Sequence, residues 1–96
     1  MIKFGEWNCK LHTAFYDNGR TALMLVDAED GSPIAKASVN IPEEKLAANE
    51  VMIKGWSENA GMQEALIAAG VIGPELRRVP AGRCEATVHK CLKRST

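Results

Sequence analysis

Apolar and polar residues alternate with a period of two near the start of the chain, from Trp7 to Phe15. This pattern is typical of a half-buried β-strand, and it places Trp7, Leu11 and Phe15 towards the core. The sequence Asp17-Asn18-Gly19 follows directly. It predicts a tight hairpin, because an Asn-Gly pair tolerates positive φ at both central positions of the turn.

Two more strands are predicted after this hairpin. Residues 21–27 (TALMLVD) are apolar on both alternating faces, which indicates a central strand that is covered on at least part of each side. Pro33 cannot donate a ladder hydrogen bond, so the third strand should start at about Ile34 and run to Ile41. Its wet face would carry Lys36, Ser38 and Asn40. Together the three strands form a meander.

One convincing helix is predicted between a brief strand at 51–53 and Gly70. Apolar residues recur there at i, i+3, i+4 and i+7, which makes a single stripe facing the sheet. The stripe consists of Met62, Ala65, Leu66 and Ala69. Ser57 or Asn59 is expected to cap the helix, since either side chain can accept a hydrogen bond from an orphan amide. Gly70 should close it as the C′ residue.

The last part of the chain reads as a hairpin with arms at 77–79 and 84–92 about a turn at 80–82. The predicted order is β-β-β-(β)-α-β-β, an α+β fold with a mainly antiparallel sheet of about five strands and one amphipathic helix packed on one face. A chain of 96 residues has the length of one domain, which we assign to residues 1–92, with a polar tail at 93–96.

Charge is balanced overall but not along the chain. Residues 1–74 carry six Lys/Arg and ten Asp/Glu, whereas residues 75–96 carry six and two, so the two parts have net charges of −4 and +4. A general DNA-binding domain would show a clearer basic excess, so direct nucleic-acid binding is not expected. No apolar run approaches the ~18 residues that span a bilayer. Three cysteines without an export signal indicate reduced thiols in the cytoplasm.

Cysteine and histidine are the candidates for metal binding or catalysis. Two thiolates and two imidazoles could form a zinc site, from Cys9, His12, His89 and Cys91. Their spacing is poor, because Cys9 and His12 point to opposite faces of a strand and no Cys-x-x-Cys pair is present. A nucleophile and base could only be Cys91 with His12 or His89. We therefore expect no metal, no cofactor and no catalytic residue.

Two groups of residues are candidates for partner binding. The first surrounds an aromatic in the turn before the helix: Lys54, Trp56, Ser57, Glu58 and Asn59. Trp56 would serve as a contact anchor, or alternatively its ring caps the helix–sheet core. The second group is basic and suits an acidic partner: Arg77, Arg78 and Arg83. It has no stacking aromatic in the same segment, which disfavours a single-strand platform.

Several short motifs carry a family resemblance. They are YDNGR at 16–20, SVNIP at 38–42, IKGWSEN at 53–59 followed by Gly61-Met62, and LIAAG at 66–70. The chain resembles a family of short bacterial proteins of unknown function that are carried on conjugative elements and phages. The resemblance covers nearly the whole chain and implies a bacterial host. Genes on such elements often counter host defence, such as restriction or CRISPR immunity.

These observations lead to two hypotheses. The first is a non-enzymatic interaction protein of a mobile element, acting as an anti-defence inhibitor that occupies the surface of a nucleic-acid-handling complex. The alternative is a sensor or sequestering module for a small ligand such as a nucleotide, with Arg77, Arg78 and Arg83 gripping its phosphates.

Overall fold

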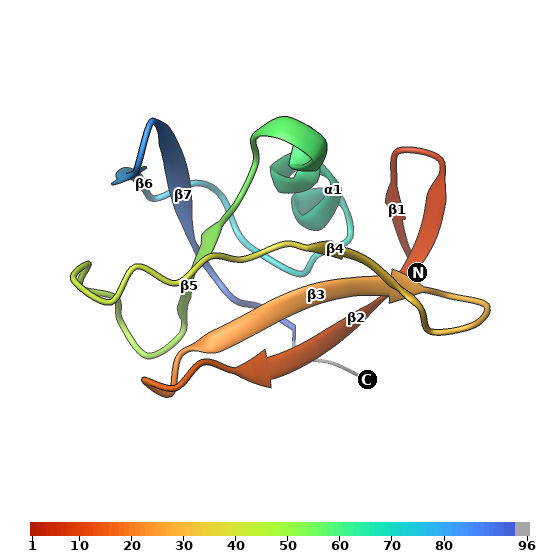
Figure 1. Cartoon of the computed structure of the whole chain (residues 1–96), viewed down its shortest axis with the longest axis horizontal. Helices are drawn as coiled ribbons and strands as arrows, with labels where there is room; N and C mark the ends of the chain where they lie inside the picture. Colours follow the sequence, from red (N-terminus) through yellow and green to blue (C-terminus); the bar gives the residue numbers. More distant parts are fainter. Residues whose placement is uncertain (94–96) are drawn as a thin grey trace.

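The computed structural model describes residues 1–93, which form two antiparallel sheets and one short helix (Figure 1). The α+β class predicted from the sequence is confirmed, although residues 1–93 contain seven strands that divide between two sheets. The first sheet contains β1 (Ile2–Phe4), β2 (Trp7–Phe15), β3 (Thr21–Asp27) and β4 (Pro33–Lys36) in that order. The second has the order β5-β7-β6, with bounds Glu50–Ile53, Cys84–Lys90 and Arg77–Ala81.

The β2–β3 hairpin forms where it was predicted, but its turn differs. Tyr16 and Arg20 bracket a three-residue loop, since the amide of Tyr16 donates to Arg20 O and the amide of Gly19 donates to Tyr16 O. Gly19 has a φ of 86°, whereas Asn18 does not have a positive φ. The expectation of positive φ at both Asn and Gly is therefore wrong. Three-residue hairpin loops need the left-handed conformation only at their last residue.

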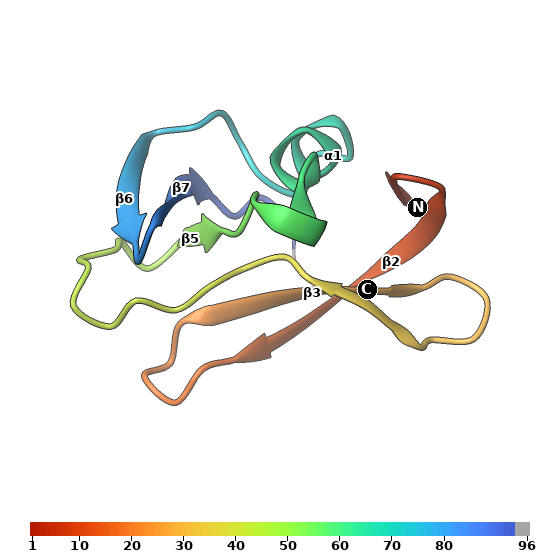
Figure 2. The same cartoon turned by 45° about the horizontal axis from the view of Figure 1, so that its top comes forward.

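The predicted third strand is split between the two sheets. β4 ends at Lys36, and Ser38 then forms an antiparallel bridge with Ile53 of β5. Ser38 was expected on a wet face, but it is buried, where its hydroxyl oxygen accepts a hydrogen bond from the amide of Leu23. The chain thus crosses from one sheet to the other at a buried polar residue. Figure 2 shows the second sheet on one side of the helix and the β1–β2 hairpin on the other.

Two apolar clusters fill the interior. The larger lies between the first sheet, the helix and β5, and its fully buried members include Leu23, Leu25, Ile53, Met62 and Leu66. The smaller lies on the other face of the second sheet and consists of Met52, Val79, Ala86 and Val88, with Val39, Ile41, Leu46, Trp56 and Ala81 packed against it. Alternation along β5 sends neighbouring side chains into different clusters.

The helix α1 spans Met62–Ala68 and follows a 3₁₀ turn, η1, at Ser57–Asn59. Its predicted stripe is confirmed, because Met62 and Leu66 are buried in the larger cluster. The capping prediction is wrong: Gly61 is the N-cap residue and no side chain caps the helix. The C-terminus ends as predicted at Gly70, whose φ is 72°. The amides of Gly70 and Val71 donate to Ile67 O and Leu66 O in the Schellman pattern.

The strand β2 extends beyond the core at both ends. Cys9 is fully buried and Leu11 packs against the larger cluster, as their face predicts. Trp7 and Phe15 are 48% and 71% exposed, so their predicted place in the core is wrong. A nine-residue strand is about 30 Å long, and the layer that covers it is shorter. The strand β1, which pairs with the start of β2, was not predicted.

The C-terminal hairpin has slightly different bounds from those expected. β6 continues to Ala81, and the turn is formed by Gly82 and Arg83. β7 ends at Lys90, after which Cys91 forms a bridge with Ile72. Of the predicted polar tail at 93–96, only Lys93 belongs to the described residues. Among residues 1–93, no helix has the length and apolarity required to cross a bilayer.

Candidate functional site

A groove of about 450 Å³ lies between the start of the first sheet, the edge of β4 and the turn at 54–59. We call it the β4 groove, and it is lined by Phe4, Trp7, Ile34, Ala35, Lys36, Lys54, Glu58 and Asn59. The β1–β2 hairpin rises beside α1 on the same side of β3 and β4 (Figure 1), which brings the two edges of the first sheet towards one groove. Three of the predicted partner-binding residues line it.

Trp7 supplies the exposed aromatic surface of this groove. It pairs with Phe4 across the turn between β1 and β2, and Phe4 itself is largely buried. The indole of Trp7 remains 48% exposed because this end of β2 extends past the core. A partly exposed indole beside apolar β4 residues is the type of anchor that contributes most to protein interfaces. The sequence pattern did not predict this exposure of Trp7. Periodicity indicates which face of a strand is apolar, but not how far along the strand the core extends.

Lys54 lies at the rim of the groove. Its ammonium nitrogen is 3.3 Å from Glu58 Oε1 and 5.9 Å from the centroid of the Trp56 ring. The pKa of Glu58 is lowered by a hydrogen bond from its own backbone amide and by Lys54. An exposed pair of this kind contributes little to stability, because water screens the two charges. Its main effect is to hold one positive and one negative group side by side at the rim.

Trp56 lies on the smaller cluster rather than in the groove. Its ring is half-buried against the cluster around Met52, and Lys54 lies over it. Of the two interpretations from the sequence, the ring does cap a core, but that core belongs to the second sheet. Ser57 is exposed and has a φ of 55°, the one positive φ at a non-glycine residue among the described residues.

Asn59 shapes the floor of the groove. It is only 2% exposed, and its side-chain amide donates to Lys36 O at 2.5 Å and to Lys54 O at 3.0 Å. Both carbonyls belong to segments that would otherwise separate, the edge of β4 and the end of β5. We therefore assign Asn59 a structural role: it ties β4 to the turn at 54–59.

The three predicted arginines are spread over the second sheet. Arg77 donates to Lys45 O at 2.9 Å and lies 3.2 Å from Glu50 Oε1. The pKa of Glu50 is lowered by the amide of Ala47 and by Arg77. Arg78 lies 2.9 Å from Glu75 Oε2. Two of the three guanidinium groups are thus already engaged with carboxylates, while Arg83 occupies the β6–β7 turn.

The cysteines and histidines occupy separate environments. Within residues 1–93, no group of three or more Cys, His, Asp or Glu side chains is arranged to hold a metal ion. His89 is buried, and its Nδ1 lies 2.8 Å from Gly73 O while its Nε2 lies 2.8 Å from the Thr87 hydroxyl. A carbonyl only accepts, so Nδ1 carries the proton. Burial and the nearby Asp27 raise the pKa of the Cys9 thiol, which favours its protonated form.

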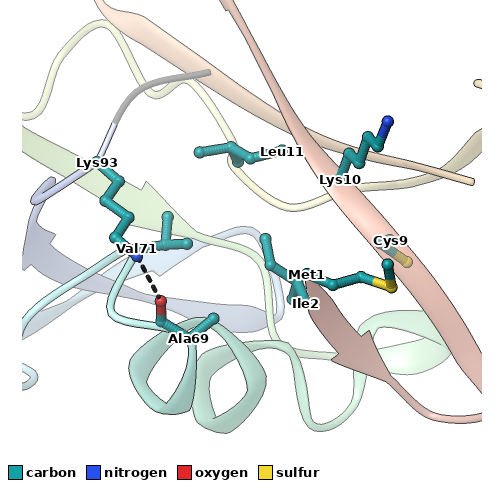
Figure 3. Close-up of a pocket in the computed structure, with 8 residues that line it drawn as sticks. All are labelled: Met1, Ile2, Cys9, Lys10, Leu11, Ala69, Val71 and Lys93. Atoms are coloured by element: carbon teal, nitrogen blue, oxygen red, sulfur yellow. Dashed lines mark hydrogen bonds between the residues drawn. The ribbon is translucent and has the colours of Figure 1, made fainter. Parts of the chain in front are cut away.

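A smaller hollow of about 140 Å³ lies at the opposite end of the helix (Figure 3). It is lined mainly by apolar residues: Met1, Ile2, Cys9, Leu11, Ala69 and Val71, with Lys10 and Lys93. Lys93 donates to Ala69 O at 3.3 Å, and Lys10 points away from the other side chains drawn. Its basic groups do not converge on the hollow, so it resembles a packing gap more than a binding site.

A set of hydrogen bonds that the sequence analysis missed joins two of its motifs. The Tyr16 hydroxyl lies 2.8 Å from the Ser38 hydroxyl, and the Asn18 amide donates to Asn40 Oδ1 at 3.3 Å. Arg20 donates to the carbonyls of Ile41 and Glu44. We call these contacts the hairpin latch: Tyr16, Asn18 and Arg20 with residues 38–44. The sequence does contain a sign of these contacts. Polar residues recur at every second position both in YDNGR (16, 18 and 20) and in SVNIP (38 and 40).

Comparison with known proteins identifies no relative. A scan of protein-family models, a search of curated proteins and a search of solved structures each returned no match.

Proposed function

We propose that this protein is a small, non-enzymatic interaction protein that binds a partner protein through the β4 groove. The observation that carries the proposal is the exposed indole of Trp7 in a groove of about 450 Å³ whose rim presents Lys36, Lys54 and Glu58. Apolar surface surrounded by charged groups is the usual anatomy of a protein interface. The partner should place an apolar side chain against Trp7 and an acidic one near Lys36.

Lys36 is the reason for expecting an acidic group on the partner. It is exposed on the edge strand, and no ion pair of Lys36 is found among residues 1–93. Lys54, in contrast, is already paired with Glu58. A carboxylate of the partner would therefore interact first with Lys36.

The non-enzymatic part of the proposal is supported by the environments of His89, one of the two base candidates, and of the buried Cys9 thiol. Both ring nitrogens of His89 are engaged with Gly73 and Thr87 in a buried site. The buried Cys9 thiol has a raised pKa, which works against a nucleophilic thiolate. These two groups act as core residues rather than as reagents.

The biological setting in this proposal comes from the family resemblance. Proteins of that kind are encoded on mobile elements, so we propose that the partner belongs to a host defence complex that handles nucleic acid. Binding would inhibit this complex by occupying its surface. The alternative, a nucleotide-binding module, has less support, because Arg77 and Arg78 are paired with Glu50 and Glu75.

Phage plating on a bacterial host that expresses a restriction or CRISPR system tests this proposal. The wild-type protein should raise plating efficiency, and Trp7→Ala combined with Lys36→Glu should abolish the effect. Phe15→Ala is the matched control, since Phe15 is an exposed aromatic of the same strand outside the groove. Absence of protection and of any partner in a pull-down would contradict the proposal, as would equal loss in the control.

A further inference from the structure

The outer face of the first sheet has a composition that does not suit contact with water. The side chains of β3 that point away from the larger cluster are Ala22, Met24 and Val26, and Ala14 of β2 lies beside them. None of these four residues belongs to either apolar cluster. A sheet with one solvated face normally carries polar residues there. This face is apolar at its centre, and none of the described helices or strands is packed on it.

Basic residues flank the apolar stripe on both sides. Lys10 and His12 of β2 are opposite Val26 and Met24, and Lys36 of β4 is opposite Met24 on the other side. The remaining outward positions of these strands among the described residues carry Asn8, Ala14 and Pro33, so the outward positions of β2, β3 and β4 carry no carboxylate. Asp27 ends β3 at a position that pairs with the buried Cys9, on the opposite face of the sheet. Asp17 and Glu29 lie in the loops at the two ends of β3.

The spacing of this face matches one class of partner. Neighbouring strands lie ~4.8 Å apart, so the basic residues of β2 and β4 are about 10 Å apart across β3, close to the diameter of an α-helix. Alternate residues along β3 are ~6.8 Å apart, and residues four apart on a helix are ~6 Å apart. A helix lying along β3 can therefore place apolar side chains on Met24 and Val26 and acidic ones beside Lys10 and Lys36.

We propose that the outer face of the first sheet is a second interaction surface, which binds an amphipathic helix whose apolar stripe is flanked by glutamate or aspartate. This surface is distinct from the β4 groove, although Lys36 borders both. Single-stranded nucleic acid fits the face less well, because the outward positions of β2, β3 and β4 carry no aromatic side chain on which a base could stack.

A designed peptide tests this inference without knowledge of the natural partner. The probe is an amphipathic helix of about 14 residues, with a leucine stripe flanked by glutamates, and its twin has lysine at every glutamate position. Fluorescence anisotropy at low salt measures binding of each peptide to the whole protein. The glutamate peptide should bind at least about tenfold more tightly than its twin. Amide chemical shifts should change along β2, β3 and β4.

Variants identify the surface that is used. Lys10→Glu combined with Met24→Ser should weaken binding of the glutamate peptide about tenfold. Trp7→Ala is the matched control and should leave that binding unchanged, because it alters only the groove. The inference is overturned if both peptides bind equally, if shift changes centre on Trp7, or if a single-stranded oligonucleotide binds as tightly as the glutamate peptide. None of these outcomes depends on the plating assay, so the two proposals fail separately.

Discussion

The hairpin latch and the β4 groove lie at two ends of the same sheet and use their polar residues in opposite ways. In the latch, Tyr16, Asn18 and Arg20 direct their polar atoms at the chain between 38 and 44. In the groove, Trp7 and Lys36 are exposed to solvent. The latch joins the YDNGR and SVNIP motifs, whereas the groove is lined in part by the IKGWSEN motif and has the surface suited to a partner. Two of the sequence motifs in this chain therefore mark an internal contact rather than a binding site.

Arg20→Ala should have the largest effect on this comparison. It removes two hydrogen bonds from a charged donor to Ile41 O and Glu44 O, and it releases the segment that covers the smaller cluster. We expect the free energy of unfolding to fall by about 3 kcal/mol, measured by equilibrium urea denaturation. Arg20→Lys retains the charge but cannot reproduce the two guanidinium hydrogen bonds, so its loss of unfolding free energy should lie between those of the wild type and Arg20→Ala. A loss below about 0.5 kcal/mol for Arg20→Ala would show that the latch contributes little to the stability of the fold.

Asn59→Ala should come next, because it removes both donors that tie β4 to the turn at 54–59. The carbonyls of Lys36 and Lys54 would lose their partner in a mostly buried place, at a cost of about 2 kcal/mol. Urea denaturation measures this loss. Glu58→Ala is the control, since this exposed neighbour contributes only a surface ion pair and its loss should leave stability nearly unchanged. Equal effects of the two variants would refute the structural role of Asn59.

Tyr16→Phe should have a smaller effect. It deletes only the hydroxyl that lies 2.8 Å from the Ser38 hydroxyl, and Ser38 retains its bond from the Leu23 amide. We expect a loss of about 1 kcal/mol, with urea denaturation as the measurement. Phe15→Ala, on the neighbouring exposed ring, should leave stability nearly unchanged. If Phe15→Ala costs more than Tyr16→Phe, the latch is not what holds this end of the sheet.

Lowering the pH should weaken the ion pairs of the second sheet but not the hydrogen bonds of the latch. The pKa of Glu75 is lowered by Arg78 and Gln63, and that of Glu50 by the amide of Ala47 and by Arg77. Their ordinary value is 4.5, so their contribution is present above about pH 4.5 and is lost as the pH falls through the lowered values. The effect should be small, since the arginine partners of these carboxylates are exposed to solvent.

The latch provides the internal control for this pH dependence. Arg20 binds backbone carbonyls, which do not titrate, so the cost of Arg20→Ala should be the same at pH 7 and pH 3. The cost of Arg78→Ala should shrink over that range. Urea denaturation of each variant across the pH series measures both. A pH-dependent cost at Arg20 would contradict the assigned contacts.

The sequence predicted the elements whose signals are local. The strand at Thr21–Asp27 and the stripe of Met62 and Leu66 agree with the structure, because turn residues and periodicity define them without tertiary information. The cap was mispredicted because Asn59 has tertiary partners that compete with the helix amides. The β1 strand has only three residues, too few for a periodic pattern.

The candidate site was predicted only in part. Lys54, Glu58 and Asn59 were identified and line the groove, whereas Trp7, Ile34 and Lys36 were not assigned to it. These six residues come from separate segments that meet only when the first sheet curves and Ser38 redirects the chain towards β5. Neither event leaves a periodic signal in the sequence. The arginines were grouped because they are close in sequence, but Arg77 and Arg78 form ion pairs with different carboxylates, Glu50 and Glu75.

Urea denaturation of Trp7→Ala beside Arg20→Ala is the most direct test of the contrast between groove and latch. The account predicts a loss of about 3 kcal/mol for Arg20→Ala and of less than about 0.5 kcal/mol for Trp7→Ala, because an overhanging indole contributes little to the isolated fold. The opposite order, with Trp7 carrying the stability and Arg20 dispensable, would contradict it.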